Sequence, residues 1–146
     1  MKKIFSYTMA TTFGLGYLPV SGTFGSMFPI ALYIFFPSPV LLWSVFIFNC
    51  IVAFPVCDHA MRLFGRKDPS EVVIDEVIGQ FIPLLILRPA EPAMIFLTFI
   101  LFRIFDALKI PPVDLMEKKG GSYGIIMDDV AAGIYTTACV FLLQKL

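Results

Sequence analysis

Long apolar stretches without a single charge dominate the first part of the chain. No Asp, Glu, Lys, Arg or His occurs between Lys3 and Asp58, and within this stretch residues 27–36 and 40–57 are almost wholly apolar. The break Pro37-Ser38-Pro39 between them suits a tight turn, because proline ends helices. The pattern therefore predicts a membrane hairpin, although its first arm is short against the ~20 residues of a full span.

The segments on either side of this hairpin are polar. Residues 4–26 are rich in glycine and hydroxyl side chains, which is typical of a loop. Residues 58–67 are polar and basic, and Asp68-Pro69-Ser70-Glu71 then has the pattern of a helix start: an N-cap Asp, Pro at the first helical position, and Glu three residues after the cap. We therefore expect a helix from Asp68 to about Leu87.

The second half of the chain repeats the hairpin pattern. Residues 88–92 form a turn, and residues 93–110 form a helix that is apolar until it reaches Arg103. After the prolines at 111 and 112, a glycine-rich segment at 120–124 leads into a last helix that opens with Asp128-Asp129. The expected fold class is all-α, a small polytopic membrane bundle of two helical hairpins plus a C-terminal helix. It forms a single membrane-embedded domain over residues 1–146.

Charge placement predicts a topology. When both hairpin turns lie on one side of a membrane, most basic residues lie on the other, which the positive-inside rule assigns to the cytoplasm. These are Lys2, Lys3, Arg62, Arg66, Lys67, Lys109, Lys118 and Lys119. The same placement gathers the acids Asp58, Asp68, Asp75, Glu76, Asp106, Asp128 and Asp129 on that side.

Composition supports membrane insertion and excludes several functions. The chain is 58% hydrophobic and 15% charged, above the roughly 45–50% apolar usage of soluble domains. Its formal net charge is zero, so there is no basic footprint for nucleic acid. The spacing of the three cysteines fits neither a disulfide framework nor a zinc site. The sequence carries no signal for an oligomeric state.

The acids are the candidate chemistry. Five of them, Asp75, Glu76, Asp106, Asp128 and Asp129, would repel one another in a low dielectric unless a cation compensates. Oxygen ligands favour Mg²⁺, Mn²⁺ or Ca²⁺, and Mg²⁺ commonly combines one or two carboxylates with water and phosphate oxygens. Two plainer readings stay open: acids near helix starts are favoured by the helix dipole, and Asp106 between Arg103 and Lys109 could be a simple salt-bridge triad.

A second element could contact phosphate, and several covalent mechanisms are excluded. The loop from Ser21 to Ser26 precedes a helix, where backbone N–H groups can hold a phosphate, although turn formation or helix packing explains it equally well. No Arg lies six residues after Cys57, His59 is the only histidine, and Asp128-Asp129 does not form an Asp-x-Asp nucleophile motif. A metal-activated water remains the simplest nucleophile for phosphate chemistry.

Four motifs together resemble a known family. They are residues 19–26 (PVSGTFGS), 68–80 (DPSEVVIDEVIGQ), 102–111 (FRIFDALKIP) and 120–133. In this order and spacing they resemble the bacterial phosphatidylglycerophosphatase A family over nearly the whole chain. The resemblance implies Mg²⁺-dependent removal of the terminal phosphate from phosphatidylglycerophosphate, which gives phosphatidylglycerol in the bacterial inner membrane. The matching functional positions are Thr23, Asp75, Glu76, Arg103, Asp106, Lys109, Asp128 and Asp129.

These observations combine into one hypothesis and its rival. We expect Asp75, Glu76, Asp106 and Asp129 to bind the metal or orient water, with Asp128 as a further ligand. Arg103 and Lys109 would hold the phosphate, and Gly22 and Thr23 would donate hydrogen bonds to the phospholipid headgroup while its acyl chains stay in the bilayer. The rival is a small ion- or proton-pathway protein, in which the acids would be spread through the membrane depth rather than gathered at one end.

Overall fold

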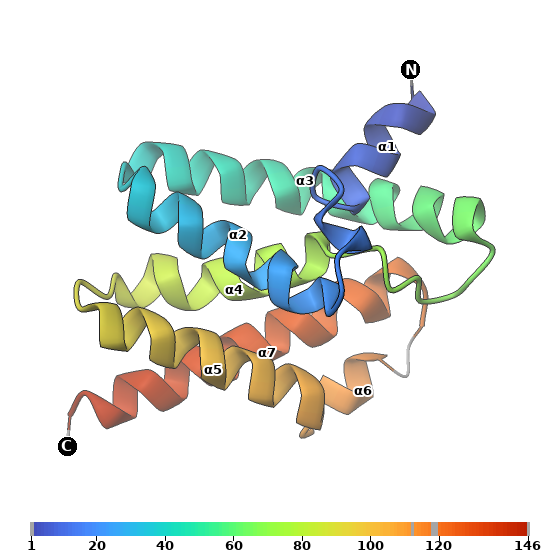
Figure 1. Ribbon diagram of the computed structural model, residues 1–146. Coiled ribbons are helices and arrows are strands. Elements are labelled where there is room, and N and C mark those ends of the chain that lie inside the picture. The colour runs from blue at the N-terminus through green and yellow to red at the C-terminus, as the bar shows by residue number, and fades with distance from the viewer. Residues whose placement is uncertain (1, 112, 118–119, 146) are drawn as a thin grey trace.

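The computed structural model describes residues 2–111, 113–117 and 120–145, and this part of the chain is helical without strands. The elements are α1 (Lys2–Ala10), the 3₁₀ turn η1 (Leu15–Tyr17), α2 (Ser21–Phe35), α3 (Pro39–Phe64), α4 (Ile74–Leu87), α5 (Pro92–Leu108), α6 (Val113–Glu117) and α7 (Gly121–Leu143). Figure 1 shows the α2–α3 and α4–α5 hairpins with both of their turns at one end of the bundle, and α7 as the long last helix. The predicted all-α fold is confirmed.

Helix α4 is the centre of the bundle. Eleven of its 14 residues are buried, and it packs against α2, α3, α5 and α7. Its contact with α7 is backbone to backbone: a Cβ on Gly133 would lie 2.4 Å from the carbonyl oxygen of Gly79, and a Cβ on Gly79 would lie 2.7 Å from that of Asp129. Glycine at these two positions therefore lets α4 and α7 approach closely, which brings Asp129 beside α4.

Within the part of the chain that the structure describes, two helices are long and apolar enough to cross a membrane, α3 and α7. At 1.5 Å per residue their 26 and 23 residues span about 39 and 34 Å, more than the ~30 Å of a bilayer core. Core helices of soluble proteins pass the same test but are mostly buried. Only 28% of the most apolar stretch of α3 is buried inside the protein, so most of this stretch faces outward, as expected of a helix in contact with lipid.

The prediction of a loop over residues 4–26 is wrong. Most of this segment is helical, because α1 ends at Ala10 and α2 begins at Ser21. Helix α1 packs along α3: Ala10 is fully buried, and the ring centroids of Tyr7 and Phe64 are 6.2 Å apart. These tertiary contacts outweigh the low helix propensity of the glycine and threonine residues.

The predicted helix start at Asp68 is also wrong, because α4 begins six residues later at Ile74. The intervening backbone instead packs against residues 10–21. The Ser21 hydroxyl donates to the Ser70 carbonyl oxygen at 2.7 Å, and the Val73 N–H donates to the Ala10 carbonyl oxygen at 2.9 Å. Contacts with a distant segment therefore take the place of the capping pattern that the sequence predicts.

Three smaller boundaries differ from the prediction. Helix α3 continues through the polar residues 58–64, the short helix α6 follows Pro111, and α7 begins at Gly121, seven residues before Asp128. The predicted basic residues Lys118 and Lys119 lie outside the described residues.

Candidate active site

A polar cavity of about 510 Å³ lies where α2, α4 and α7 begin and α5 ends. We call it the polar cavity. It is lined by Val20, Ser21, Gly22, Lys67, Asp68, Pro69, Ser70, Val72, Asp75, Glu76, Arg103, Asp106, Lys109, Gly120, Gly121, Ile125, Asp128 and Asp129. All predicted site residues except Thr23 are in this set, so residues from four helices and two loops meet in one place. Thr23 is not part of the lining, so that Ser21 and Gly22 are the residues that the start of α2 contributes.

Three helix N-termini point their positive dipole ends toward the polar cavity. The N-cap residues of α2, α4 and α7 are Val20, Val73 and Gly120, and within the described residues none of the three caps its helix with a side-chain hydrogen bond. The first N–H groups of a helix have no partner inside the helix, and they carry partial positive charge. Three such termini in one cavity form an environment suited to an anion such as phosphate.

The start of α2 has a strained backbone. Val20 has φ +60° and ψ +54°, the left-handed region that a β-branched residue rarely adopts. Its conformation turns the chain into α2, whose first residues, Ser21 and Gly22, line the polar cavity. Such strain is often stored at functional sites.

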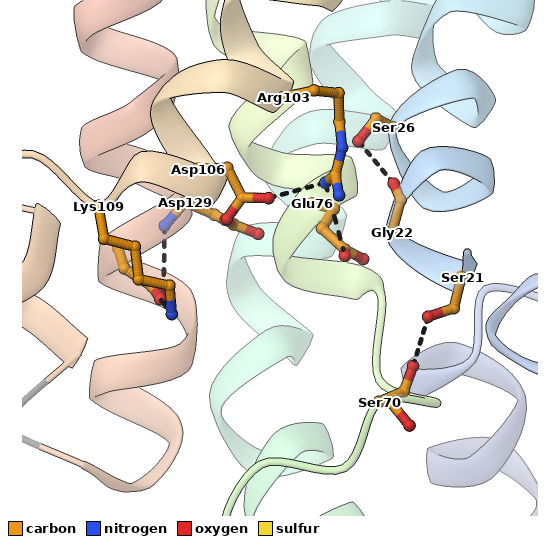
Figure 2. Close-up of polar contacts among 10 residues, drawn as sticks. Ser21, Gly22, Ser26, Ser70, Glu76, Arg103, Asp106, Lys109 and Asp129 are labelled. Atoms are coloured by element: carbon orange, nitrogen blue, oxygen red, sulfur yellow. Dashed lines mark hydrogen bonds and ion pairs between the residues drawn. The ribbon is translucent and has the colours of Figure 1, made fainter.

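Arg103 connects two of the acids. Its Nη1 lies 2.8 Å from Asp106 Oδ2, three residues further along α5, and 3.8 Å from Glu76 Oε1 on α4. Figure 2 shows the guanidinium group between these two carboxylates. Lys109, which ends α5 with φ +47°, places its Nζ 3.5 Å from Asp128 Oδ2 on α7. The cations of α5 therefore link this helix to α4 and α7 across the polar cavity.

Two glycines of α2 make room for the Glu76 carboxylate. A Cβ on Gly22 would lie 2.1 Å from Glu76 Oε1 and 2.9 Å from Arg103 Nη2, and a Cβ on Gly25 would lie 2.9 Å from Glu76 Oε2. Gly22 and Gly25 are three residues apart and share one helix face. This face therefore fits the Glu76–Arg103 pair only when it carries no side chains.

Acids outnumber cations in the polar cavity. Six acidic and three basic side chains line it, a formal charge of −3 when all are ionised. Asp75, Asp128 and Asp129 are each less than 10% exposed. Asp75 Oδ1 and Glu76 Oε2 are buried and have no hydrogen-bond partner among the described residues, a costly state that a bound cation or a proton would relieve.

The donor set suits a hard divalent cation with few protein ligands. Among the described residues, no three Asp, Glu, His or Cys side chains are grouped closely enough to hold one metal ion. Mg²⁺ does not require such a group, because it commonly takes one or two carboxylates and keeps water or phosphate oxygens at its other positions. The unpartnered oxygens of Asp75 and Glu76 are the atoms best suited to that role.

The segment before α4 also lines the polar cavity, which the sequence did not predict. Lys67 and Ser70 line the polar cavity, although the sequence suggests only a basic connection and a helix start there. An ion pair fixes this segment: Arg66 Nη2 lies 2.5 and 2.7 Å from the two carboxylate oxygens of Glu71. Burial alone would raise the pKa of Glu71, but the hydrogen bonds from Arg66 outweigh it, and the pKa lies below its ordinary value. The hydrogen bond from Ser21 to Ser70 places this segment at the polar cavity. Because the two residues are far apart in the sequence, no local pattern predicts that placement.

The outward-facing apolar helices and the charged cavity place the chain in the class of small helical membrane proteins with a polar site at one end of the bundle. The profile of the phosphatidylglycerophosphatase A family matches residues 8–144. The chain therefore belongs to the phosphatidylglycerophosphatase A family.

Two of three similar proteins carry the name of this family, and the third carries the name of another lipid phosphatase. The chain is 32% identical to a Haemophilus influenzae protein named phosphatidylglycerophosphatase A, over 94% of this chain and 88% of the relative. It is 30% identical to the Escherichia coli protein of the same name, over 94% and 82%. It is 37% identical to a Bacteroides thetaiotaomicron protein provisionally named a phosphatidylinositol-3-phosphatase, over 88% and 86%. No solved structure matches the chain significantly.

Proposed function

We propose that this protein is a lipid phosphatase that hydrolyses the terminal phosphomonoester of phosphatidylglycerophosphate, giving phosphatidylglycerol and inorganic phosphate. The observation that carries the proposal is the convergence of three helix N-termini, Arg103 and Lys109 on one acid-lined cavity in a protein with lipid-facing helices. Family membership and the names of two relatives support the choice of substrate.

We propose Mg²⁺ as the cofactor on electrostatic grounds. A phosphomonoester brings about 1.5 to 2 negative charges at neutral pH into a cavity whose side chains already sum to −3. Three helix termini, each equivalent to about half a positive charge, offset only part of this. A divalent cation held by Asp75 and Glu76, with Asp106, Asp128 and Asp129 as further candidates, would supply the missing charge. When bound, it would neutralise phosphoryl oxygens and lower the pKa of a water molecule.

The side chains of the polar cavity have separate roles in this proposal. Arg103 uses part of its five donors on Asp106 and Glu76, and its remaining N–H groups are available to phosphate oxygens. Lys109 adds a second cation, and the backbone N–H groups at Gly22 add uncharged donors at the start of α2. This set stabilises the charge that spreads over the phosphoryl oxygens in the transition state.

The buried carboxylates supply the water-orienting groups. Asp129 is 3% exposed and lies beside α4, so its oxygens can accept hydrogen bonds from a water molecule held against the phosphorus atom. As the new P–O bond forms, a carboxylate takes a proton of that water, and the ester P–O bond to the glycerol oxygen breaks in line. A second carboxyl group of the polar cavity, in its protonated form, donates its proton to the glycerol oxygen, so that the lipid leaves as an alcohol and the water oxygen ends in inorganic phosphate. Proton exchange with solvent then restores both carboxyl groups.

We propose that the polar cavity faces the cytoplasm in the bacterial inner membrane. Arg62, Arg66, Lys67 and Lys109 lie toward this end of the bundle, whereas Arg88 at the hairpin turn and Lys145 after α7 lie at the other end. This distribution follows the positive-inside rule. A site at the membrane surface suits a phospholipid whose headgroup enters while its glycerol stays at the interface.

A comparison of substrates tests the proposal. The purified protein in detergent would receive phosphatidylglycerophosphate, phosphatidylinositol-3-phosphate or phosphatidic acid, with release of inorganic phosphate as the readout. The highest kcat/KM is expected for phosphatidylglycerophosphate. A preference for phosphatidylinositol-3-phosphate would instead assign to this chain the activity that the name of the Bacteroides relative states. Ion flux in liposomes without phosphate release from any of the three lipids would support the rival ion-pathway function.

A further inference from the structure

A second, apolar cavity of about 740 Å³ lies between the two hairpins, toward their turns. We call it the apolar groove. Helix α2 contributes Met27, Ile30 and Ile34, helix α5 contributes Ile95, Phe96 and Phe99, and α4 also lines it. Arg88 is the only charged residue in its lining, and it lies at the turn after α4.

The apolar groove lies beyond the polar cavity along helices that line both. On α5, Arg103 of the polar cavity and Phe99 of the apolar groove are four residues apart and share a helix face. On α2, Met27 begins the apolar lining five residues after Gly22 of the polar cavity. Figure 1 shows α4 between α2 and α5, and α4 lines both cavities. The two cavities therefore follow one another along α4 and α5, and they share no lining residue.

The distance along α2 from the polar cavity to the far end of the apolar groove fits half the thickness of a bilayer core. From Gly22 to Ile34, α2 rises about 18 Å at 1.5 Å per residue, close to the ~15 Å depth of one leaflet. At the far end, the Tyr33 hydroxyl donates to the Pro89 carbonyl oxygen at 3.1 Å, which ties α2 to the turn between α4 and α5. The apolar groove is thus bounded at the hairpin turns.

We propose that the apolar groove binds one acyl chain of the phospholipid whose phosphate enters the polar cavity. This inference rests on the proposed lipid phosphatase function, and it adds which part of the substrate is recognised beyond the headgroup. The apolar lining favours a hydrocarbon occupant over a charged one, and the groove ends about one leaflet's depth from the phosphate-binding groups. Buried apolar area then contributes binding energy in proportion to chain length until the chain reaches Ile34.

Photo-crosslinking tests the location directly. The full chain in detergent would receive phosphatidylglycerophosphate with a diazirine near the end of one acyl chain, followed by mass spectrometry of the labelled peptides. Labels are expected on the α2 and α5 peptides that hold Ile34 and Phe96. Phosphate release with labels spread over the outer face of α3 would overturn the inference and leave the phosphatase function intact. Absence of phosphate release would instead contradict the proposed function.

A matched pair of substitutions tests the energetic role. Ile34 is 53% exposed and lines the apolar groove, whereas Ile47 on α3 is 51% exposed and lies outside it. Ile34→Trp is expected to lower the ratio of kcat/KM for a long-chain over a dihexanoyl substrate by about tenfold, the loss of roughly two buried methylene groups. Ile47→Trp should keep the wild-type ratio. An equal ratio in both variants would overturn the inference, as would a change of oligomeric state caused by Ile34→Trp alone, which would mark this face as a contact between two copies.

Discussion

The two ends of the same helices differ sharply in chemistry. Where α2 and α4 begin, Gly22 and carboxylates line the polar cavity. Toward the hairpin turns, the lining of the apolar groove is mainly apolar, with Arg88 and the Tyr33 hydroxyl as its polar groups. Helix direction explains part of the difference. The starts of α2, α4 and α7 meet at the polar cavity, and α5, whose negative end lies there, carries the cations Arg103 and Lys109.

The comparison shows how a small bundle can process an amphipathic substrate. The polar end supplies anion-binding backbone, cations and carboxylates, and the apolar end supplies a surface equivalent to lipid. Only α4 is buried along nearly its whole length, so it aligns the two ends. If the two ends are as distinct in function as in composition, substitutions in the polar cavity should lower catalysis, and substitutions in the apolar groove should change the preference for acyl chain length.

The largest effect is expected from the buried acids of the polar cavity. Asp129→Asn should lower kcat for phosphate release by about a hundredfold or more, the scale of losing one electrostatic contact to a transition state. Asp106→Asn should have a similar effect. Asp58→Asn, on α3 and outside the cavity lining, is the control and should stay near wild type. Activity near wild type in Asp106→Asn would remove this residue from the metal and water-binding set.

The next effect is expected at Arg103. Arg103→Lys keeps the charge but cannot hold Asp106 and Glu76 while also presenting a planar pair of donors to phosphate. We expect kcat/KM to fall by about ten- to a hundredfold, since hydrogen bonds to charged groups contribute about 1.5–3 kcal/mol. Steady-state kinetics of both Arg103→Lys and Arg103→Gln would measure it. Full activity in the glutamine variant would show that the guanidinium does not contact the phosphate.

Two glycine substitutions should separate activity from stability. Gly22→Ala forces the Glu76 carboxylate to move, because the new Cβ would lie 2.1 Å from its Oε1, and we expect about tenfold less activity, the cost of roughly 1.4 kcal/mol. Gly133→Ala meets the rigid Gly79 carbonyl oxygen at 2.4 Å and should lower the free energy of unfolding by about 1–3 kcal/mol. Thermal unfolding in detergent and phosphate release, measured on both variants, distinguish these effects. Equal losses of activity at equal stability would refute the distinction.

The smallest effect concerns the ion pair beside the polar cavity. The pKa of Glu71 is lowered in the folded state, so the Arg66–Glu71 pair stabilises the fold above the unfolded pKa of about 4.3, and this contribution is lost as pH falls through the folded pKa. Because Arg66 is largely exposed, we expect the pair to contribute less than about 1 kcal/mol. Glu71→Gln should therefore lower the melting temperature slightly at pH 7, and the difference from wild type should shrink as pH falls below the unfolded pKa of about 4.3. A difference that does not change with pH would assign the effect to packing.

The sequence predicted more of the site than of its scaffold. Uncharged apolar runs and proline breaks correctly predicted both hairpins. Eight of the nine residues proposed for the site line one cavity. The predicted start of α4 was wrong because Val73 and Ser70 form hydrogen bonds with Ala10 and Ser21, which lie about 50 residues or more away in the sequence. Propensity rules cannot anticipate such contacts. For the same reason, the sequence did not predict that Lys67 lines the polar cavity.

Hydrolysis of a phospholipid phosphomonoester in the polar cavity, with the help of a divalent cation, is tested most simply by phosphate release from phosphatidylglycerophosphate. The purified protein would be assayed before chelation, after chelation, and after Mg²⁺ is added back. We expect activity that disappears with chelator and returns with Mg²⁺. Undiminished phosphate release in the presence of chelator would contradict the role of the cation, and no release under any of the three conditions would contradict the claim itself.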